Sequence, residues 1–500
     1  MSGIFVSSDR TPTLSERTVR AAMWTTGGRF FTKGLDLISL LILARFLGPE
    51  EFGVVAMAMT AVLIVETFSE MPLSAALLNY PVPSEAMYDT AFSIGLLRAV
   101  AIVATLCALS WPLSLLYDEP RLIALQCALS LAPAMRGLVS QRLTEYARAL
   151  DFRRDVALEV MAKIGSLVIA SALAIATGSY WAIAVGKIST TAIAMLASYV
   201  VAPQRIRFTL SQWHLFADML GWYAARQIFA AINWQADKVV LPHFVDTATF
   251  GQFTWADNLI SVPAQAIIQP ITPPLFSAFI VARQGGNLGK VYLKASSGVF
   301  SVVGTIFLLM AMLAHPIIHL VLGPNWNESA PLLTWLAFAA FIGYAPTVLL
   351  PALAMALNRT RIAFAKLAIE FCVKVPLIIA LTMTMQLQGM LIGHAISAVL
   401  GFFITLILVK ELTRLTILAQ LQNLLRPMVA MIPMAIFLYA ASNLFGIHDS
   451  ALYTFVHLCW TCGVAILIFT ASDLALWKLA GSPDGSEALA LKMVKKNIRL

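Results

Sequence analysis

FLGPEEFG, residues 46–53, returns 198 residues later in the chain as FVDTATFG, residues 244–251. The first Phe and the final Phe-Gly pair keep their places in both copies. Two residues further along keep the same displacement: Ala58 recurs as Ala256, and Pro72 recurs as Pro270. Ordered matches at one displacement indicate that the chain contains two copies of one structural unit.

Two later parts of the chain extend this repeat. The tripeptide Trp111-Pro112-Leu113 corresponds to His315-Pro316-Ile317 at a displacement of 204. At a displacement of 211, three residues recur together: Glu159, Lys163 and Gly178 as Glu370, Lys374 and Gly389. The displacement grows slowly along the chain, as loop insertions between equivalent helices would make it.

The composition indicates an all-α polytopic membrane protein. Hydrophobic residues make up 59% of the 500 positions and charged residues 12%, and the mean hydropathy is +0.82. A soluble domain does not have this composition. Fourteen apolar stretches are long enough for helices that span a membrane: 21–47, 52–78, 88–116, 121–147, 155–176, 179–202, 214–243, 247–280, 291–321, 329–357, 361–385, 387–409, 425–445 and 451–478.

Lys and Arg residues between these stretches predict the orientation. With the N-terminus in the cytoplasm, 23 cations fall in the inner segments, and only Arg45 and Arg121 fall in the outer ones. Cytoplasmic loops carry such an excess of Lys and Arg, so both termini are expected inside the cell. The net charge of +8 then belongs to the inner loops, where it suits anionic membrane lipids and predicts no nucleic-acid partner.

Six spans per repeat is an even number, so both copies enter the membrane from the same side. The expected body is therefore two six-helix lobes related by a pseudo-twofold axis along the membrane normal, with two further helices at the C-terminus. The predicted segments are a cytoplasmic N-terminal segment (1–20), an N-lobe (21–202), a cytoplasmic linker (203–213), a C-lobe (214–410), two additional helices (425–478) and a basic cytoplasmic tail (479–500).

Short loops and missing motifs predict that the protein is not an enzyme. The longest outer connection holds about ten residues around positions 322–327, too few for an external catalytic domain. Gly27-Gly28 and Gly285-Gly286 lack the Lys-Ser/Thr that follows a phosphate-binding glycine loop. His315 and His319 have no evident third metal ligand. We therefore expect no cofactor and no metal.

The opening residues resemble a known family. The run 24–31, followed by Leu43-Ala44-Arg45-Phe46-Leu47-Gly48-Pro49-Glu50-Glu51-Phe52-Gly53, is similar to the start of the polysaccharide transporter branch of the multidrug/oligosaccharidyl-lipid/polysaccharide exporter superfamily. The resemblance covers nearly the whole chain in helix count and in the six-plus-six repeat of the MATE-like fold. Within that branch it is most similar to Wzx-type flippases, such as the colanic acid and succinoglycan exporters.

The resemblance implies a function in glycan export. Such a protein would move a polyprenyl-pyrophosphate-linked oligosaccharide across the bacterial inner membrane by alternating access, for exopolysaccharide or lipopolysaccharide synthesis. Its partners would be this lipid-linked oligosaccharide, membrane lipids, and the polymerase and chain-length machinery of the pathway. A cation-coupled drug or small-molecule antiporter and a lipid II flippase of the same superfamily are the alternatives.

Nine cations fall inside the apolar stretches: Arg29, Lys33, Arg98, Arg136, Lys163, Lys187, Arg226, Lys238 and Lys374. At roughly 2.5–3.5 kcal/mol each, their burial would cost on the order of 20–30 kcal/mol. Acids, water or an anionic ligand must therefore offset that cost.

These cations differ in whether an acid lies three or four residues away on the same helix. Acids at helical spacing predict three pairs: Lys33 with Asp36, Glu159 with Lys163, and Glu370 with Lys374. The neighbours Asp237 and Lys238 are left open between scaffold and function. Five cations have no acid three or four residues away: Arg29, Arg98, Arg136, Lys187 and Arg226.

These five, together with Lys33, are the predicted pyrophosphate site. The planar guanidinium fork suits phosphate oxygens, and Lys adds a point charge. The alternative is that acids on neighbouring helices neutralise each cation. Four acids are candidates for ion coupling: Asp36, Glu66, Glu70 and Asp257. Glu66 and Glu70 lie one turn apart, where mutual repulsion favours protonation of one; the alternative is that both pair with Arg29 and Arg98.

Overall fold

The structure is a computed structural model that describes residues 14–216, 233–444 and 451–482, except positions 72, 79, 81 and 150. Within this part of the chain, the secondary structure is helical. The contacts divide the chain into two units. The first is Met1–Leu47 with Met57–Ala231, and the second is Gly48–Ala56 with Ile232–Leu500. Most of the predicted termini, 1–20 and 479–500, lies outside the described residues.

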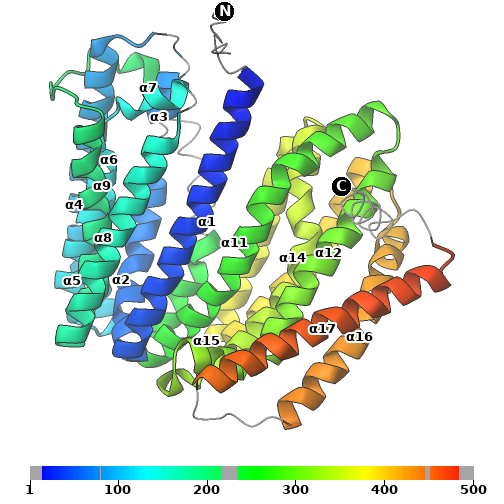
Figure 1. The fold of residues 1–500 in the computed structure, drawn as a ribbon. Helices are drawn as coiled ribbons and strands as arrows, with labels where there is room; N and C mark the ends of the chain where they lie inside the picture. Colours follow the sequence, from blue (N-terminus) through cyan, green and yellow to red (C-terminus); the bar gives the residue numbers. More distant parts are fainter. Residues whose placement is uncertain are drawn as a thin grey trace, which may run out of the picture. The chain divides into compact units, whose positions relative to one another are not determined.

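The first unit is a bundle of helices that run beside one another (Figure 1). α8 packs against both α1 and α9, and α4 packs against α5 and α6. The helices are α1 (Leu14–Phe46), α2 (Pro49–Phe68), α3 (Leu73–Leu78), α4 (Glu85–Tyr117), α5 (Arg121–Leu129), α6 (Leu131–Gly137), α7 (Leu143–Arg148), α8 (Arg153–Thr177) and α9 (Trp181–Val201).

The second unit repeats this pattern and adds two helices. It begins in the described residues with a helical segment at 233–240. The elements that follow are η1 (Leu241–His243), α11 (Thr247–Gln284), α12 (Leu288–Met312), α13 (Ala314–Val321), η2 (Pro324–Trp326), α14 (Ser329–Ala356), α15 (Thr360–Thr413), α16 (Ile417–Leu444) and α17 (Ala451–Leu479). α14 packs against α11, α12 and α15.

Helices account for thirteen of the fourteen expected spans, and the seventh, 214–243, lies partly outside the described residues. Nine of the described helices are long and apolar enough to cross a membrane. Three spans are broken where one helix was expected: 52–78 forms α2 and α3, 121–147 forms α5, α6 and α7, and 291–321 forms α12 and α13. A hydropathy pattern reports apolar length but not such breaks in the backbone.

α15 contains two of the expected spans, joined at Gln386. This residue has φ 50° and ψ −127°, which no helix contains. The chain turns back so sharply that a Cβ atom on Gly389 would lie 2.0 Å from the carbonyl oxygen of Leu381. Only Gly fits there. The expected boundary between spans 361–385 and 387–409 is therefore confirmed.

The two copies of the repeated Phe-Gly pair meet in the second unit. A Cβ atom on Gly53 would lie 1.9 Å from the carbonyl oxygen of Thr247, and one on Gly251 would lie 2.1 Å from the carbonyl oxygen of Pro49. Pro49 and Thr247 are themselves equivalent positions, since both pairs are displaced by 198. A twofold relation requires reciprocal contacts of this kind. The first turns of α2 and α11 therefore show the predicted symmetry directly.

Aromatic residues pack around this helix crossing. The ring of Phe52 lies 5.3 Å from Trp255 and 5.3 Å from Trp326, and the two indoles are 5.6 Å apart, all edge to face. Trp255 and Trp326 are almost fully buried. Edge-to-face aromatic pairs contribute about 0.5–1.5 kcal/mol each beyond the area they bury. This cluster fixes the start of α2 within the second unit.

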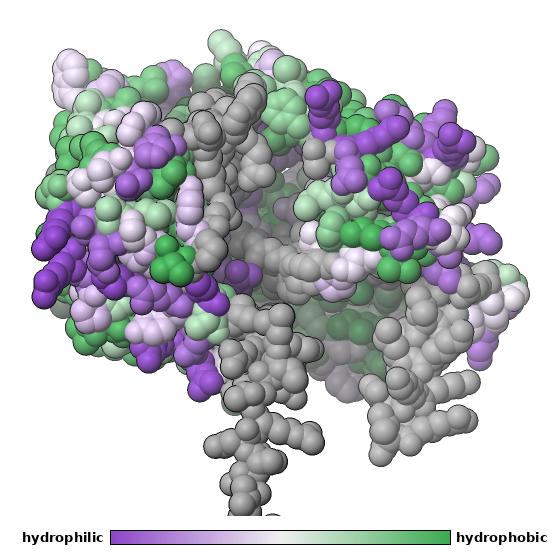
Figure 2. Space-filling view, turned by 90° about the horizontal axis from the view of Figure 1, so that it is seen from above, coloured by the Kyte–Doolittle hydropathy of each residue, from purple (hydrophilic) through white to green (hydrophobic). Residues whose placement is uncertain are grey.

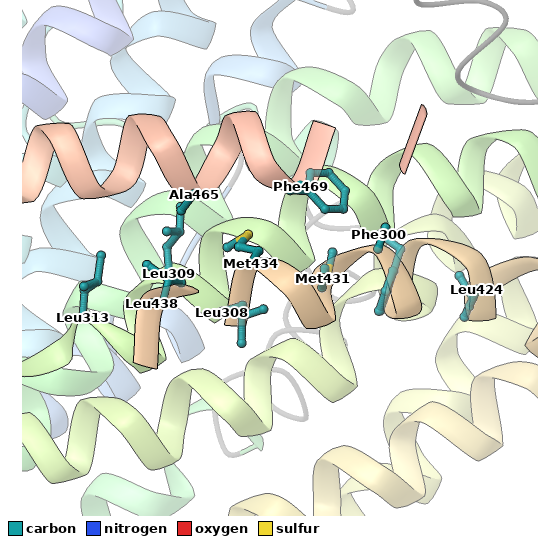
Figure 3. Close-up of a cluster of buried hydrophobic side chains, with 11 residues drawn as sticks. Phe300, Leu308, Leu309, Leu313, Leu424, Met431, Met434, Leu438, Ala465 and Phe469 are labelled. Carbon is teal, nitrogen blue, oxygen red and sulfur yellow. The ribbon is translucent and has the colours of Figure 1, made fainter. Parts of the chain in front are cut away.

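The added helices α16 and α17 close one side of the second unit. Their apolar side chains pack against α12 in a continuous cluster (Figure 3). Met434 and Leu438 of α16 and Ala465 of α17 have no exposed surface. Phe300 and Leu308 of α12 belong to the same cluster, so both added helices pack against α12.

Residues 203–213, expected to link the lobes, are bound to the first unit. The amide nitrogen of Thr209 donates to Ser93 of α4 (3.0 Å), and the side chain of Gln204 accepts from the amide of Gln141 (2.9 Å). In the view of Figure 2, hydrophilic side chains lie among hydrophobic ones on this face.

Replacing Gly53 tests the helix crossing. Gly53→Ala places a methyl group against backbone, so α2 and α11 must separate, at a cost of about 1–3 kcal/mol for overpacking. We expect a lower thermal unfolding midpoint for the purified protein in detergent. The control is Gly463→Ala in α17, where an added Cβ meets nothing within 4 Å. Equal midpoints for the two variants would contradict the crossing.

Candidate functional site: two clusters of charged side chains

The first unit holds an ion pair between Arg136 of α6 and Glu66 of α2. The side chain of Glu66 is 13% exposed, whereas that of Arg136 is 59% exposed. The carboxylate therefore sits inside the bundle, and the guanidinium extends from it to the accessible surface. Several of the Arg136 N–H groups remain available to a ligand, because a guanidinium has five donors.

Arg98 of α4 lies beside this pair. It interacts electrostatically with Glu66, Glu70 and Arg136. Its Nε atom is buried and has no hydrogen-bond partner among the described residues. Two arginines thus share the acids of α2 without being fully satisfied by them.

Glycine brings the two arginine-bearing helices together. A Cβ atom on Gly95 would lie 2.5 Å from the carbonyl oxygen of Gly137, and one on Gly137 would lie 3.3 Å from that of Gly95. The backbones of α4 and α6 therefore touch. Arg98 and Arg136 each lie within one turn of this contact, which explains their proximity although they are 38 positions apart in the sequence.

A second ion pair, between Lys163 of α8 and Asp36 of α1, belongs to the same cluster. Lys187 of α9 connects the two pairs, since it interacts electrostatically with Lys163, Asp36, Arg136 and Glu66. Its side chain is exposed. Six helices thus contribute to one group of charges in the first unit, called here the cationic cluster: Asp36, Glu66, Glu70, Arg98, Arg136, Lys163 and Lys187.

The structure brings most of the predicted site residues together. Arg98, Arg136 and Lys187 belong to the cationic cluster. Arg29 and Lys33 are exposed on α1, on the same helix as Asp36, and form no ion pair with another described residue. Arg226 lies outside the described residues.

Two local pairs expected in this unit are wrong. Lys33 does not pair with Asp36, and Glu159 does not pair with Lys163, because Asp36 and Lys163 bind each other. The expected contact of Glu66 with Arg29 is also replaced, by Arg136. Helical spacing makes local pairs available, but a bundle brings residues of other helices equally close.

The second unit contains a corresponding group of charges. The side chain of Asp237 is 10% exposed and accepts a hydrogen bond from Nζ of Lys374 at 3.1 Å. Nε2 of His394 lies 2.9 Å from the same carboxylate oxygen, Oδ2. These three residues join the segment 233–240 to both halves of α15.

Two further pairs surround Asp237. Lys238 binds Asp257 of α11 at 2.8 Å, and Lys366 binds Glu370 at 2.7 Å. The expected pair between Glu370 and Lys374 is therefore wrong. Asp237 and Lys238, left open by the sequence, both take partners on other helices.

All of these charged residues except Lys366 line a cavity of about 380 Å³ within the second unit. The segment 233–240 and helices α11, α14 and α15 form its walls. Uncharged polar groups and aromatic rings also line it, among them Trp234, Asn258, Tyr344 and Ser397. Its volume is in the range of small-molecule binding sites. Of the predicted site residues that the structure describes, only Asp257 lines it.

The repeat contained a signal for these cross-helix pairs. Lys163 and Lys374 are equivalent positions in the sequence, and each binds an Asp on the first span of its own unit, Asp36 or Asp237. The acids lie 201 positions apart, close to the displacement of 198 in this part of the repeat. Matching the acids of both first spans with the two lysines predicts both pairs.

The fold defines a class of protein, the polytopic helical membrane proteins. The lipid II flippase MurJ in an inward closed conformation aligns with a TM-score of 0.70 at 15% identity, over 92% of this chain and 99% of that chain. An inward-facing multidrug resistance MATE family transporter of the MOP superfamily aligns with a TM-score of 0.54 at 13% identity, over 77% and 96% of the two chains. Both likenesses concern the fold.

The sequence identifies the family. Residues 42–331 match the polysaccharide biosynthesis protein family, and the chain belongs to it. The succinoglycan biosynthesis transport protein ExoT of Rhizobium meliloti is 26% identical over 340 residues, which is 66% of this chain and 67% of that protein. The lipopolysaccharide biosynthesis protein WzxC of Escherichia coli is 21% identical over 338 residues, or 66% and 68%. The expected superfamily and multi-pass membrane fold are confirmed.

The variant Asp237→Ala tests whether Asp237 stabilises the second unit by pairing with Lys374. Asp237→Ala leaves the ammonium of Lys374 buried without its carboxylate, and breaking a buried pair in this way costs about 3–5 kcal/mol. We expect a much lower thermal unfolding midpoint, partly restored in the double variant Asp237→Ala/Lys374→Met.

The control is Glu411→Ala, because Glu411 and its partner Arg359 are both more than half exposed and lie 3.8 Å apart. Such a pair contributes about 0–1 kcal/mol. Similar midpoints for Asp237→Ala and Glu411→Ala would contradict a structural role for Asp237.

Proposed function

We propose that this protein flips a polyprenyl-pyrophosphate-linked oligosaccharide across the bacterial inner membrane, for the synthesis of an exopolysaccharide or lipopolysaccharide. The named relatives are a succinoglycan biosynthesis transport protein and a lipopolysaccharide biosynthesis protein, which supports this substrate class. The polymerase and chain-length machinery that use the flipped unit are the expected partners.

One observation carries the proposal: the first unit gathers more cations than acids within its helical bundle. The cationic cluster has four Lys and Arg side chains and three carboxylates, and Arg29 and Lys33 add two exposed cations on α1. A membrane protein keeps such a surplus only where water or an anion offsets its cost. A pyrophosphate supplies negative charge and several acceptor oxygens.

The geometry suits this ligand. Arg136 is bound to Glu66 and leaves its outer donors accessible, and Arg98 lies beside this pair. Hydrogen bonds between Arg and phosphate oxygens are charge-assisted and often bidentate. In this proposal Arg98 and Arg136 hold the pyrophosphate, and Lys187, Arg29, Lys33 and Arg226 add positive charge along its path.

The same surplus argues against an antiporter for cationic drugs. A cationic substrate would meet Arg98, Arg136 and Lys187 before it reached an uncompensated acid. Asp36 and Glu66 are both bound to cations of the protein.

Charge reversal tests the pyrophosphate site. Arg136→Glu and Arg29→Glu should reduce polymer export in a strain that depends on this protein by about tenfold to a hundredfold, the equivalent of the 1.5–3 kcal/mol of a charge-assisted hydrogen bond. Export is measured as surface polysaccharide per cell, and immunoblots of the membrane fraction report the protein level.

Two controls separate charge from folding. Arg359→Glu reverses an exposed cation outside the cationic cluster and should leave export unchanged. The double variant Arg136→Gln/Glu66→Gln removes the ion pair without changing the net charge, and export should still fall. Normal export with normal protein levels in Arg136→Glu would exclude Arg136 from the site.

We also propose that acids of the cationic cluster couple flipping to an ion gradient. Glu66 interacts with Arg136 and Arg98, so protonation of its carboxylate would weaken both contacts and free the guanidinium groups for the substrate. Asp36 binds Lys163 and Asp257 binds Lys238, so protonation of either carboxylate would weaken its ion pair in the same way. Glu70 shares Arg98 with Glu66.

Reconstituted vesicles test this coupling. An imposed proton or sodium gradient should accelerate flipping of lipid-linked oligosaccharide, and Glu66→Gln should abolish that acceleration because the amide cannot be charged. The matched control is Glu145→Gln, which changes an exposed acid of α7 that binds Arg142 outside the cationic cluster. Flipping that ignores both gradients would overturn the coupling, while leaving the flippase itself intact.

A further inference from the structure

The first unit contains a charged pocket at the end where α4 begins. Its volume is about 480 Å³, and its walls are the start of α4, Arg142 before α7 and the linker 203–213. Arg142 is bound to Glu85, which also lines the pocket. The linker contributes Arg205 and Arg207, whose side chains are exposed and form no ion pair with another described residue. The pocket therefore presents two available guanidinium groups.

The linker is held along α4 beside the start of a spanning helix. Nε2 of Gln204 donates to the carbonyl oxygen of Tyr88 at 3.3 Å, and the amide of Thr209 donates to Oγ of Ser93 at 3.0 Å. Ser93 is eight residues after the first residue of α4, which corresponds to roughly 12 Å at 1.5 Å per residue. α4 is long and apolar enough to cross a membrane. The linker therefore lies at the depth where lipid headgroups meet acyl chains, on the side that the inner-loop cations assign to the cytoplasm.

Bulky apolar side chains accompany the two cations. Ile206 separates Arg205 from Arg207 and, unlike them, does not line the pocket. It is 59% exposed, and Phe208 and Trp213 are 69% and 58% exposed. Arg and aromatic residues are typical of the membrane–water interface, where apolar parts contact lipid and charged groups reach the headgroups. The linker has this composition at the matching depth.

The charges of the pocket select among the lipids. Because Arg142 and Glu85 bind each other, the remaining charges of the lining are Arg205, Arg207 and Asp89. Two cations thus outnumber one acid, which favours an anionic headgroup. Basic pockets on the cytoplasmic side of membrane proteins bind phosphate headgroups in this way.

We infer that this pocket binds the headgroup of an anionic phospholipid of the cytoplasmic leaflet. Arg205 and Arg207 bind its phosphate, and Ile206, Phe208 and Trp213 contact its acyl chains. A soluble phosphate or an acidic protein segment would use the two guanidinium groups but not the apolar side chains beside them. The lipid is a bound neighbour of the protein and is not transported, so the inference is independent of the proposed function.

Photo-crosslinking of the full-length protein in nanodiscs tests this site. The probes are photoactivatable phosphatidylglycerol and phosphatidylcholine with the same acyl chains, each at a mole fraction below saturation. Peptic digestion and mass spectrometry measure the labelling of residues 203–213. We expect phosphatidylglycerol to label them more strongly than phosphatidylcholine. Arg205→Gln/Arg207→Gln should lower the phosphatidylglycerol labelling about tenfold, because two cations near an anionic headgroup are lost.

Matched controls separate the headgroup contact from folding and from general charge. Arg359→Gln/Arg361→Gln removes two exposed cations with the same spacing in the second unit and should leave the labelling of 203–213 unchanged. Arg205→Lys/Arg207→Lys keeps both charges and should retain most of it. The thermal unfolding midpoint should be the same in all three double variants.

Three outcomes would overturn the inference. The first is equal labelling of 203–213 by both lipids in the unmodified protein. The second is unchanged phosphatidylglycerol labelling in Arg205→Gln/Arg207→Gln. The third is loss of labelling when soluble glycerol phosphate is added, since this would show a site for free phosphate instead of a lipid.

Discussion

The crossing of α2 and α11 at Gly53 and Gly251 is the constraint on which the rest of the fold depends. Each glycine lies against the backbone of the opposite helix, closer than any side chain would allow. As a result, residues 48–56 belong to the second unit, while the remainder of α2 belongs to the first. One continuous helix is thus shared between the two units, and its acids Glu66 and Glu70 lie downstream of the shared part.

Charge in an apolar bundle imposes the second constraint. Every cation in a spanning helix costs free energy, and each unit reduces that cost with the same pair between its first and fifth spans. Lys163 binds Asp36 in one unit, and Lys374 binds Asp237 in the other. Since the pair recurs at equivalent positions, it is best understood as part of the inherited scaffold. Among the described residues, the cavity of the second unit is not lined by arginines with unpaired donors like those of Arg98 and Arg136.

The sequence predicted the fold well because helix formation in a membrane depends on local properties. Apolar length sets the spans, inner-loop cations set the orientation, and the repeated Phe-Gly pair revealed the symmetry. The boundary at Gln386 was found because the two spans beside it are separately apolar. The breaks inside 52–78, 121–147 and 291–321 were missed, since they change backbone direction without lowering hydropathy. Pairing by helical spacing failed for Glu159, because Lys163 binds an acid of a neighbouring helix. For Glu370 it selected the wrong lysine, because Glu370 binds Lys366 one turn earlier instead of Lys374.

The two groups of charges also differ in what they can do for a substrate that is itself divided. A lipid-linked oligosaccharide joins a highly charged pyrophosphate to uncharged rings covered with hydroxyl groups. A site with surplus cations binds the former strongly and gives the latter no advantage. The charges around the cavity of the second unit are paired with one another, so they offer a phosphate less attraction than the surplus cations of the first unit do.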